Sequence, residues 1–329
     1  MTDPVSIDDI RAAQKRLEGH ARVTPLLESD LLNRAAGRRI LIKPECLQRT
    51  GSFKFRGAWS ALSALPVEAR ARGVIAYSSG NHAQGVAHAA ELTGTPAVII
   101  MPTDAPALKI ANTKAYGAEV VLYDRPGGES REVIGEALAT ERGLTLVRPY
   151  DEPMVIAGQG TTGLEIAQQA RAAGVDDADV LVCCGGGGLT AGIALALAAD
   201  HSGLRVRPVE PGSSDDFARS LEAGERLANQ GPITSICDAI VTPSPGDLTF
   251  PIVKRLGGPG LSVTDDEALS AMAEAFRHLK LVAEPGGAVA LAAALYRGEQ
   301  IPTDTVICTI SGGNVDPSVF ASALARENG

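Results

Sequence analysis

The chain has 329 residues, 45% of them hydrophobic, which is enough to bury the core of one large or two moderate domains. A formal net charge of −9 without a basic stripe argues against nucleic acids and anionic membranes as partners and favours a small molecule. The amino-terminal residues lack the basic and apolar regions of a signal peptide, and no stretch is apolar enough to span a bilayer, so we expect a cytoplasmic protein.

Short apolar runs alternate along the chain with alanine-rich helical stretches, a pattern typical of a parallel α/β fold. The expected strands are residues 74–77, 97–101, 119–123, 180–184, 206–210 and 305–310. Three of these strands lead directly into polar or glycine-rich loops that begin near Ser78, Gly185 and Ser311. Because ligands of open parallel sheets bind beyond the carboxyl ends of strands, these loops can meet in one crevice.

Four short motifs carry the chemistry of this crevice. They are Ser52-Phe53-Lys54-Phe55-Arg56-Gly57, Ser79-Gly80-Asn81-His82, Gly185-Gly186-Gly187-Gly188 and Ser311-Gly312-Gly313-Asn314. The four glycines lie between a buried strand and an alanine-rich helix. Their N–H groups are unhindered by side chains, and the helix dipole adds partial positive charge, so this loop is suited to a phosphate group.

The glycine loop also fits a second interpretation, a dinucleotide site. Gly186-x-Gly188-x-x-Ala191 follows a strand, begins a helix, and has Glu210 at the end of the next apolar run, where a ribose-binding acid would fall. An NAD(P)-binding Rossmann protein would leave Lys54 and the other two motifs unexplained. A non-catalytic ligand-binding module would likewise have no need of Lys54.

The four motifs together resemble those of the fold type II pyridoxal-phosphate (PLP) enzymes, specifically the serine/threonine dehydratase and serine racemase group. The resemblance covers nearly the whole chain. It implies two doubly wound, open-sheet α/β domains, similar to tryptophan synthase β, with the cofactor between them. The large domain would comprise residues 1–71 and 147–329, and the small inserted domain residues 72–146.

The resemblance also assigns a role to each motif. Lys54 would form the Schiff base with the PLP aldehyde, Phe53 would pack against the ring, and Asn81 would bond the ring hydroxyl. The phosphate would be held by Gly185, Gly186, Gly187 and Gly188, while Ser311 would face the pyridine nitrogen and Glu284 would lie near the ring.

Two of these roles make chemical sense without the family. A lysine must lose its proton to attack an aldehyde, and burial lowers its pKa. A hydroxyl opposite the ring nitrogen does not keep that nitrogen protonated, so negative charge at Cα is less delocalised into the ring. Elimination of a β-leaving group is then the expected outcome.

The substrate side is defined less sharply by the sequence. The substrate carboxylate is expected at Ser78, Asn81 and His82, at the start of a helix, although His82 also fits a structural hydrogen bond. Arg131 and Ser244 match racemase positions that line the substrate side. Arg131 lies on a charge-rich helix, which favours a solvated arginine; facing the crevice, it would instead favour a second carboxylate, as in 3-hydroxyaspartate.

Ser79 matches the racemase serine that acts as a second acid/base opposite the lysine, so the sequence is also compatible with racemisation. Its alternative is a turn serine that bonds its own backbone. Tyr150 departs from the racemase pattern, which has asparagine there, and Pro149-Tyr150-Asp151 is closer to the dehydratases.

The loop of residues 210–216 resembles the metal loop of serine racemase. The resemblance places Glu210, the carbonyl of Ser214, and Asp216 on a Mg²⁺ or Ca²⁺ ion, since such hard cations prefer oxygen ligands. An ordinary acidic turn is the alternative. The five cysteines lack the spacing of metal ligands, and we expect them to be buried as small apolar side chains.

From these features we predict a PLP-dependent ammonia-lyase that converts L-threonine or L-serine to a 2-oxo acid and ammonia by α,β-elimination. The alternatives on the same scaffold are 3-hydroxyaspartate dehydratase and serine racemase. The family resemblance further implies a homodimer.

Overall fold

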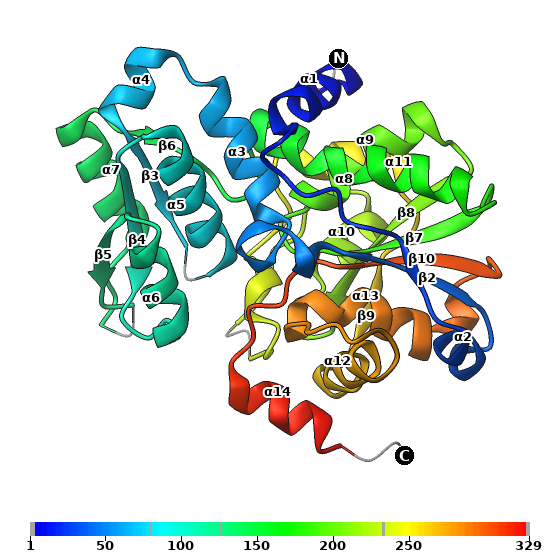
Figure 1. Ribbon diagram of the computed structural model, residues 1–329. Helices are drawn as coiled ribbons and strands as arrows, with labels where there is room; N and C mark the ends of the chain where they lie inside the picture. Colours follow the sequence, from blue (N-terminus) through cyan, green and yellow to red (C-terminus); the bar gives the residue numbers. More distant parts are fainter. Residues whose placement is uncertain (1–3, 79, 126, 232–233, 327–329) are drawn as a thin grey trace.

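The computed structural model describes residues 4–78, 80–125, 127–231 and 234–326, and contains two open sheets (Figure 1). The larger sheet has six strands in the order β1-β2-β10-β7-β8-β9, and all neighbours are parallel except the β1–β2 pair. Its strands are β1 (Leu27–Glu28), β2 (Arg39–Pro44), β7 (Ala178–Cys183), β8 (Leu204–Pro211), β9 (Leu261–Val263) and β10 (Thr305–Ile310). Together with the second sheet, this confirms the predicted α/β class.

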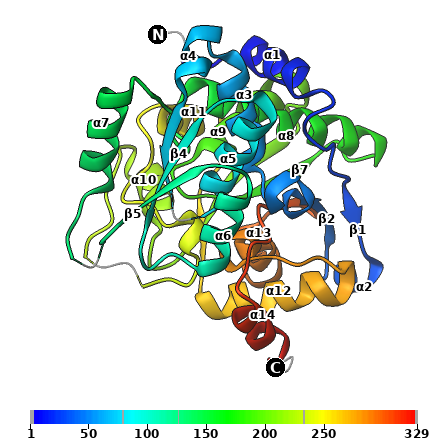
Figure 2. The same ribbon diagram turned by 60° about the vertical axis from the view of Figure 1, so that its left-hand side comes forward.

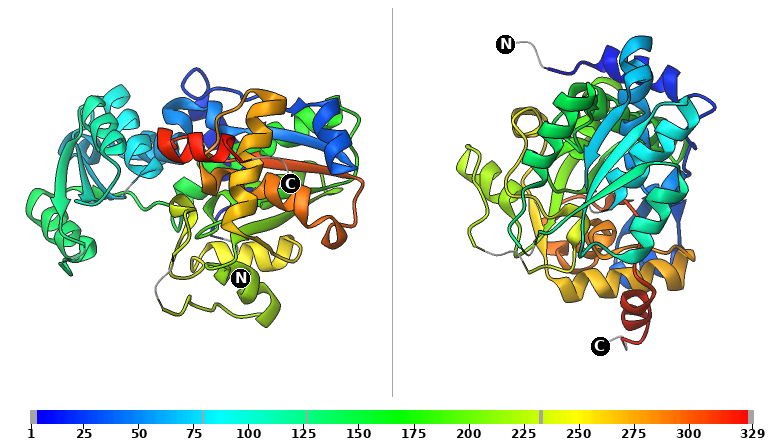
Figure 3. Two further views of the ribbon diagram at one scale, coloured as in Figure 1. Left: turned by 90° about the horizontal axis from the view of Figure 1, so that it is seen from below. Right: turned by 90° about the vertical axis from the view of Figure 1, so that its left-hand side faces the viewer.

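The smaller sheet is parallel throughout, with four strands in the order β5-β4-β3-β6. It forms a lobe to one side of the larger body (Figures 1 and 3). Its elements are β3 (Val74–Tyr77), α5 (Asn81–Thr93), β4 (Ala97–Pro102), α6 (Ala107–Ala115), β5 (Glu119–Tyr123), α7 (Arg131–Arg142) and β6 (Thr145–Leu146). The domain boundaries at residues 72 and 146 stay a prediction.

The larger sheet is buried on both faces. Along β7, Val180 and Val182 pack on the face covered by α8 and α9, whereas Leu181 and Cys183 pack on the face covered by α12 and α13. This explains why β7 reads as a continuous apolar run rather than as an alternating one. The helices of this body are α1 (Ile7–Leu17), α2 (Asp30–Ala36), α3 (Lys54–Ala64), α8 (Pro153–Ala172), α9 (Gly188–Asp200), α10 (Asp216–Ala223), α11 (Thr249–Leu256), α12 (Asp265–Leu279), α13 (Pro285–Tyr296) and α14 (Pro317–Leu324). The short helix α4 (Val67–Arg72) lies beside β6 of the smaller lobe (Figure 1).

All six predicted strands are present, with shifts at some ends. β7 ends at Cys183, one residue before the predicted end, and β8 extends to Pro211, because its ladder with β9 continues to the pair Pro211 and Val263. Among the described residues, no helix combines the length and the apolar composition needed to cross a bilayer.

The start of α3 is attached to the loop that follows β10. Ser52 forms an antiparallel bridge with Gly312, and the N–H of Phe53 donates to the carbonyl of Ser311 at 3.1 Å. Farther along, α3 crosses α8 so closely that a Cβ at Gly158 would lie 2.5 Å from the carbonyl oxygen of Arg56. On its other side α3 lies beside α5 of the smaller lobe (Figure 2). The segment that carries Lys54 is therefore held on several sides.

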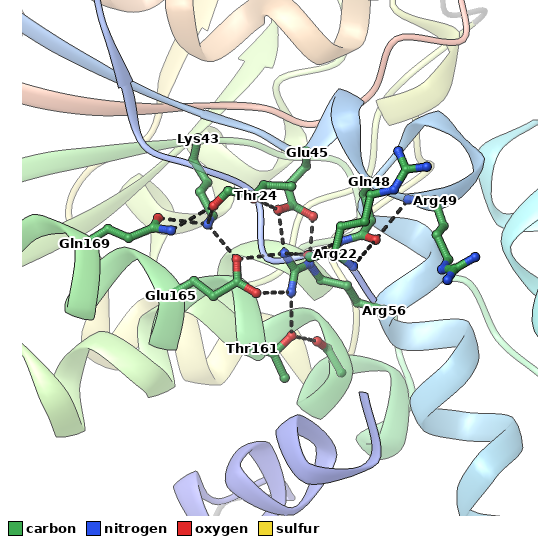
Figure 4. A network of polar contacts seen from close by, with 11 residues as sticks. Arg22, Thr24, Lys43, Glu45, Gln48, Arg49, Arg56, Thr161, Glu165 and Gln169 are labelled. Carbon is green, nitrogen blue, oxygen red and sulfur yellow. Dashed lines mark hydrogen bonds and ion pairs between the residues drawn. The ribbon is translucent and has the colours of Figure 1, made fainter. Parts of the chain in front are cut away.

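A cluster of buried charged side chains fixes the first turn of α3 (Figure 4). The Arg56 side chain is 1% exposed and binds Glu45 at 2.7 and 2.8 Å and Glu165 at 2.7 and 2.9 Å. Lys43 completes the cluster by donating to Glu165 at 2.6 Å. Although burial alone would raise it, the Arg56 guanidinium holds the pKa of Glu45 below its usual value. Two cations thus neutralise two carboxylates in the interior.

We expect Arg56→Met to lower the free energy of unfolding by about 3–5 kcal/mol, because it leaves two buried carboxylates without their main partner. Urea denaturation followed by circular dichroism measures this change. The matched control is Arg142→Met, which breaks an exposed pair with Glu119 and should cost about 1 kcal/mol or less. Equal losses in the two variants would contradict the role given to the cluster.

Candidate active site

A pocket of about 150 Å³ lies where the smaller lobe meets the larger body, beyond the carboxyl ends of β3 and β7. Residues of three predicted motifs line it, so the structure brings together segments far apart in the sequence. The lining comprises Phe53, Lys54, Tyr77, Ser78, Gly80, Asn81, His82, Lys109, Arg131, Pro149, Tyr150, residues 183–190 and residues 238–243.

Lys54 begins α3 and directs its amine into this pocket. The Nζ donates to the carbonyl oxygen of Pro149 at 2.8 Å and lies 5.0 Å from the centre of the Phe53 ring. Burial lowers the pKa of Lys54 to about 8, although the nearby Glu284 carboxylate acts in the opposite direction. An appreciable fraction of this amine is therefore unprotonated near neutral pH, as nucleophilic attack on a carbonyl requires.

The glycine loop leaves no space for side chains. A Cβ at Gly185 would lie 2.5 Å from the carbonyl oxygen of Ile240, and one at Gly186 would overlap the Tyr150 ring. Gly187 has a φ of 88°, which favours glycine. Since α9 begins at Gly188, the N–H groups of its first turn lack acceptors within the helix. This backbone cradle fits the phosphate of PLP.

Asn81 and Glu284 form a buried pair beside the pocket. The Nδ2 of Asn81 donates to Glu284 Oε1 at 2.5 Å, and the second carboxylate oxygen, Oε2, has no protein partner within the described residues. Burial raises the pKa of Glu284 to about 7, although the Lys109 ammonium opposes this shift. A carboxyl group with this pKa can donate or accept a proton near neutrality.

Ser311 lies behind the pocket lining, at the end of β10. It is 3% exposed and lies beside the thiol of Cys183, which donates to the carbonyl oxygens of Gly287 and Thr309 and does line the pocket. Cys183 is buried, as predicted for the cysteines, but its place beside Ser311 was not predicted. Nothing in the spacing of the sequence marks it, because contact between strands β7 and β10 creates the pair.

His82 is buried and neutral. Burial, followed by the positive charge of Lys54, lowers its pKa to about 3, and its Nε2 lies 2.9 Å from the carbonyl oxygen of Val147. Since a carbonyl only accepts, Nε2 carries the proton and donates to it. Ser78 accepts a hydrogen bond from the N–H of Gly80 at 3.2 Å. Ser79, the predicted second acid/base, lies outside the described residues.

Arg131, the first residue of α7, lines the pocket, although its side chain is still 41% exposed and pairs with Glu132. Its guanidinium carbon lies 5.4 Å from the centre of the Tyr77 ring, and its Nε donates to Glu132 at 2.8 Å. In the part of the chain that the structure describes, its terminal nitrogens have no hydrogen-bond partner. Ser244 is half-buried but lies beyond the lining, which ends at Pro243.

Sequence reasoning did not identify Lys109 and Asp238. Lys109 belongs to α6 of the smaller lobe, and its Nζ lies 3.2 Å from the carboxylate of Asp238 in a 3₁₀ helix of the larger body (Asp238–Ile240). Both residues line the pocket. The pair forms only when the two lobes come together, and no motif or spacing marks it in the sequence.

The predicted metal loop contains two buried carboxylates, Glu210 and Asp216. The oxygens of Glu210 accept the N–H groups of Phe217 and Ala218 at 3.0 and 2.7 Å, so this side chain caps α10. Glu210 is fully buried and does not line the pocket at the glycine loop, so it is not placed to bind a ribose there, which counts against the dinucleotide interpretation. Burial raises the pKa of Asp216 to about 6, and its Oδ2 has no protein partner within the described residues.

The two carboxylates could supply oxygen ligands to a hard cation. Asp216 would bind the cation through Oδ2, the oxygen that has no protein partner within the described residues. No group of three or more His, Cys, Asp or Glu side chains suited to a metal occurs in the described ranges. A site here would thus need backbone oxygens, as the predicted Ser214 carbonyl provides. Ser214 itself is buried, with its hydroxyl 3.4 Å from Asp216.

Comparison with known proteins agrees with the geometry of the site. The family model described as pyridoxal-phosphate dependent enzyme matches residues 17–312. An L-threo-3-hydroxyaspartate ammonia-lyase of Pseudomonas sp is 44% identical over 97% of this chain and 98% of the relative. The crystal structure of the T.th. threonine deaminase is 46% identical, with a TM-score of 0.88 and coverage of 94% of this chain and 99% of that one.

The structure of maize serine racemase is 36% identical, with a TM-score of 0.90 and 97% of each chain covered. Each of these likenesses covers at least 94% of this chain. The chain therefore belongs to the fold type II family of PLP-dependent enzymes that contains the serine/threonine dehydratases, the hydroxyaspartate ammonia-lyases and the serine racemases.

Proposed function

We propose that the protein is a PLP-dependent ammonia-lyase that converts 3-hydroxyaspartate to a 2-oxo acid and ammonia. The observation that supports this substrate is the position of Arg131 in the pocket lining, with terminal nitrogens that have no partner among the described residues. A guanidinium can bind the second carboxylate of 3-hydroxyaspartate with two hydrogen bonds. The 44% identity with a hydroxyaspartate ammonia-lyase supports the same choice.

In this proposal the side chains divide the work between binding and proton transfer. Bound PLP supplies the electron sink that stabilises negative charge at the substrate Cα. The Lys54 amine, whose pKa is about 8, removes the Cα proton. The N–H groups at the start of α5, at Asn81 and His82, receive the α-carboxylate, and Arg131 holds the distal one. Loss of water gives an enamine, which hydrolyses to the 2-oxo acid and ammonia.

L-Threonine and L-serine are the second candidates, which the 46% identity with a threonine deaminase favours. They lack the distal carboxylate, so the pocket would leave Arg131 without a substrate partner. Serine racemisation requires an acid/base on the face opposite Lys54, and the assignment of Ser79 to that role stays a prediction. Expectations of a homodimer in the cytoplasm also stay predictions.

A divalent cation, Mg²⁺ or Ca²⁺, is proposed at the 210–216 loop, with Glu210, the Ser214 carbonyl and Asp216 as ligands. The unpartnered Oδ2 of Asp216 supports it, since a buried carboxylate oxygen without a donor is unfavourable. The ion would stabilise the start of α10, which Glu210 caps. Its role would be structural.

Lys54 is expected to bind PLP covalently. Incubation with PLP and borohydride should add one reduced pyridoxyl group, and peptide mass spectrometry should locate this group on Lys54. The Lys54→Ala variant should show neither the adduct nor turnover. The control is Lys114→Met, which removes an exposed lysine of α6 outside the pocket and should keep the adduct. An adduct on another residue of the wild type would contradict this assignment.

Arg131→Met should reduce kcat/KM for 3-hydroxyaspartate by about 10- to 100-fold, because a hydrogen bond to a charged group is lost. The kcat/KM for L-threonine should change less than about 2-fold, because this substrate has no distal carboxylate. Coupled assays of 2-oxo acid release measure both substrates. Arg125→Met, at an exposed pair with Asp104, is the control and should leave both values unchanged. Equal losses with both substrates would count against a distal carboxylate at Arg131.

Removal of the metal by a chelator should lower the Tm, and added Mg²⁺ should restore it. Because Asp216 has a pKa of about 6 without metal, it is ionised above this pH and protonated below it. The Mg²⁺-dependent rise in Tm should therefore be present at pH 8 and disappear as the pH falls through about 6.

Asp216→Asn should abolish the rise in Tm at every pH. Glu222→Gln, an exposed carboxylate on the same helix, should retain it. Thermal unfolding that is unchanged by chelator at pH 8 would show that no ion is bound at this loop.

A further inference from the structure

Asn314, the last residue of the Ser311-Gly312-Gly313-Asn314 motif, has no role in the function proposed above, yet it contacts two parts of the site. Its Nδ2 donates to the carbonyl oxygen of Thr50 at 2.8 Å and to Asn81 Oδ1 at 2.7 Å. Both hydrogens of this one amide group are therefore used. One contact reaches the turn before Lys54, and the other reaches a side chain that lines the pocket.

Thr50 has a backbone conformation that is disfavoured for its side chain. Its φ of 60° and ψ of 12° lie in the left-handed region, which a β-branched residue rarely adopts, and Gly51 follows with a φ of 72°. Segment 313–314 holds this turn at two successive carbonyls. The Nδ2 of Asn314 donates to the carbonyl oxygen of Thr50, and the N–H of Gly313 donates to the carbonyl oxygen of Gly51 at 2.9 Å. The turn leads directly into Lys54.

The second contact decides the orientation of the Asn81 amide. Oδ1 of Asn81 accepts from Asn314, so the NH₂ group faces the other way, toward Glu284 Oε1 at 2.5 Å. A rotation by 180° would bring the Asn81 oxygen against the Glu284 carboxylate and leave the NH₂ groups of both asparagines facing each other. The amide therefore has one favourable orientation while Asn314 is present.

We propose that Asn314 is a positioning residue that turns the NH₂ group of Asn81 toward Glu284, the side on which it would also reach the PLP ring oxygen, and that holds the left-handed turn at Thr50 in place. The first half of this inference rests on the proposed contact of Asn81 with the cofactor ring oxygen. The second half concerns the protein alone and holds with or without bound PLP.

Asn314→Asp tests the first half most directly, since it keeps the shape of the side chain but replaces the donor NH₂ group by an acceptor oxygen. The NH₂ group of Asn81 should then rotate toward the new carboxylate, and the Asn81 oxygen should face the ring oxygen. The dissociation constant of PLP should rise about 10-fold or more, the factor expected for one lost buried hydrogen bond. The pH dependence of the visible absorption of bound PLP should shift as well.

Asn33→Asp is the matched control. Asn33 also links two segments through one amide, donating to Glu28 and accepting from the N–H of Ile40, but it lies outside the pocket lining. It should lower the Tm while leaving the PLP dissociation constant and absorption unchanged. An Asn314→Asp variant that behaves in the same way would overturn the role in orienting Asn81.

Hydrogen exchange in the PLP-free protein tests the second half. Asn314→Ala should speed exchange of the amides in residues 48–53 by about 10-fold, because one hydrogen bond to the turn is lost. Adding Thr50→Gly should restore much of the protection, since glycine adopts the left-handed conformation without steric cost. Unchanged exchange in Asn314→Ala, or a double variant no better protected than the single one, would overturn the link with Thr50. Since no cofactor is present, this result does not depend on whether the proposed function is correct.

Discussion

The amine of Lys54 is half-buried in the pocket near the Glu284 carboxyl group, and its reactivity depends on its staying there. Burial favours the neutral amine, whereas Glu284 favours the charged one, and the balance gives a pKa of about 8. A lysine in solvent would be almost fully protonated near neutrality. A small displacement of α3 would change both its burial and its distance from Glu284, so the position of its first turn controls its reactivity.

Three independent contacts hold that first turn. The Arg56 side chain binds it to Glu45, just after β2, and to Glu165 of α8; the close crossing at Gly158 fixes its distance from α8, and the 311–314 loop holds the preceding turn. The charges of the Arg56 cluster neutralise one another. Beside the pocket, Glu284 Oε2 and His82 Nδ1 are among the buried side-chain atoms that have no protein partner within the described residues, as is Asp216 Oδ2 in the 210–216 loop. Unsatisfied buried groups of this kind occur where a ligand or ion is expected.

Much of the fold, and the loops that meet at the pocket, could be predicted from the sequence because they follow local rules, whereas the roles of the individual site residues rest on the family resemblance. Buried parallel strands produce apolar runs, and glycines and polar residues mark the loops after β3, β7 and β10. Arg131 was left undecided, since a charged helix start has the same sequence whether it faces solvent or a pocket. The Lys109–Asp238 pair and the contact of Ser311 with Cys183 join elements from different parts of the chain, so no sequence spacing reveals them.

The protonation state of the Lys54 amine decides whether it can attack PLP. The pH dependence of PLP capture by the cofactor-free protein measures this protonation state most directly. The rate of appearance of the visible absorption should rise with pH as the free amine forms. The structure predicts a midpoint near pH 8, well below the usual value of 10.5 for lysine. A midpoint near 10.5, or a rate that does not change with pH, would contradict a half-buried amine held ready for attack.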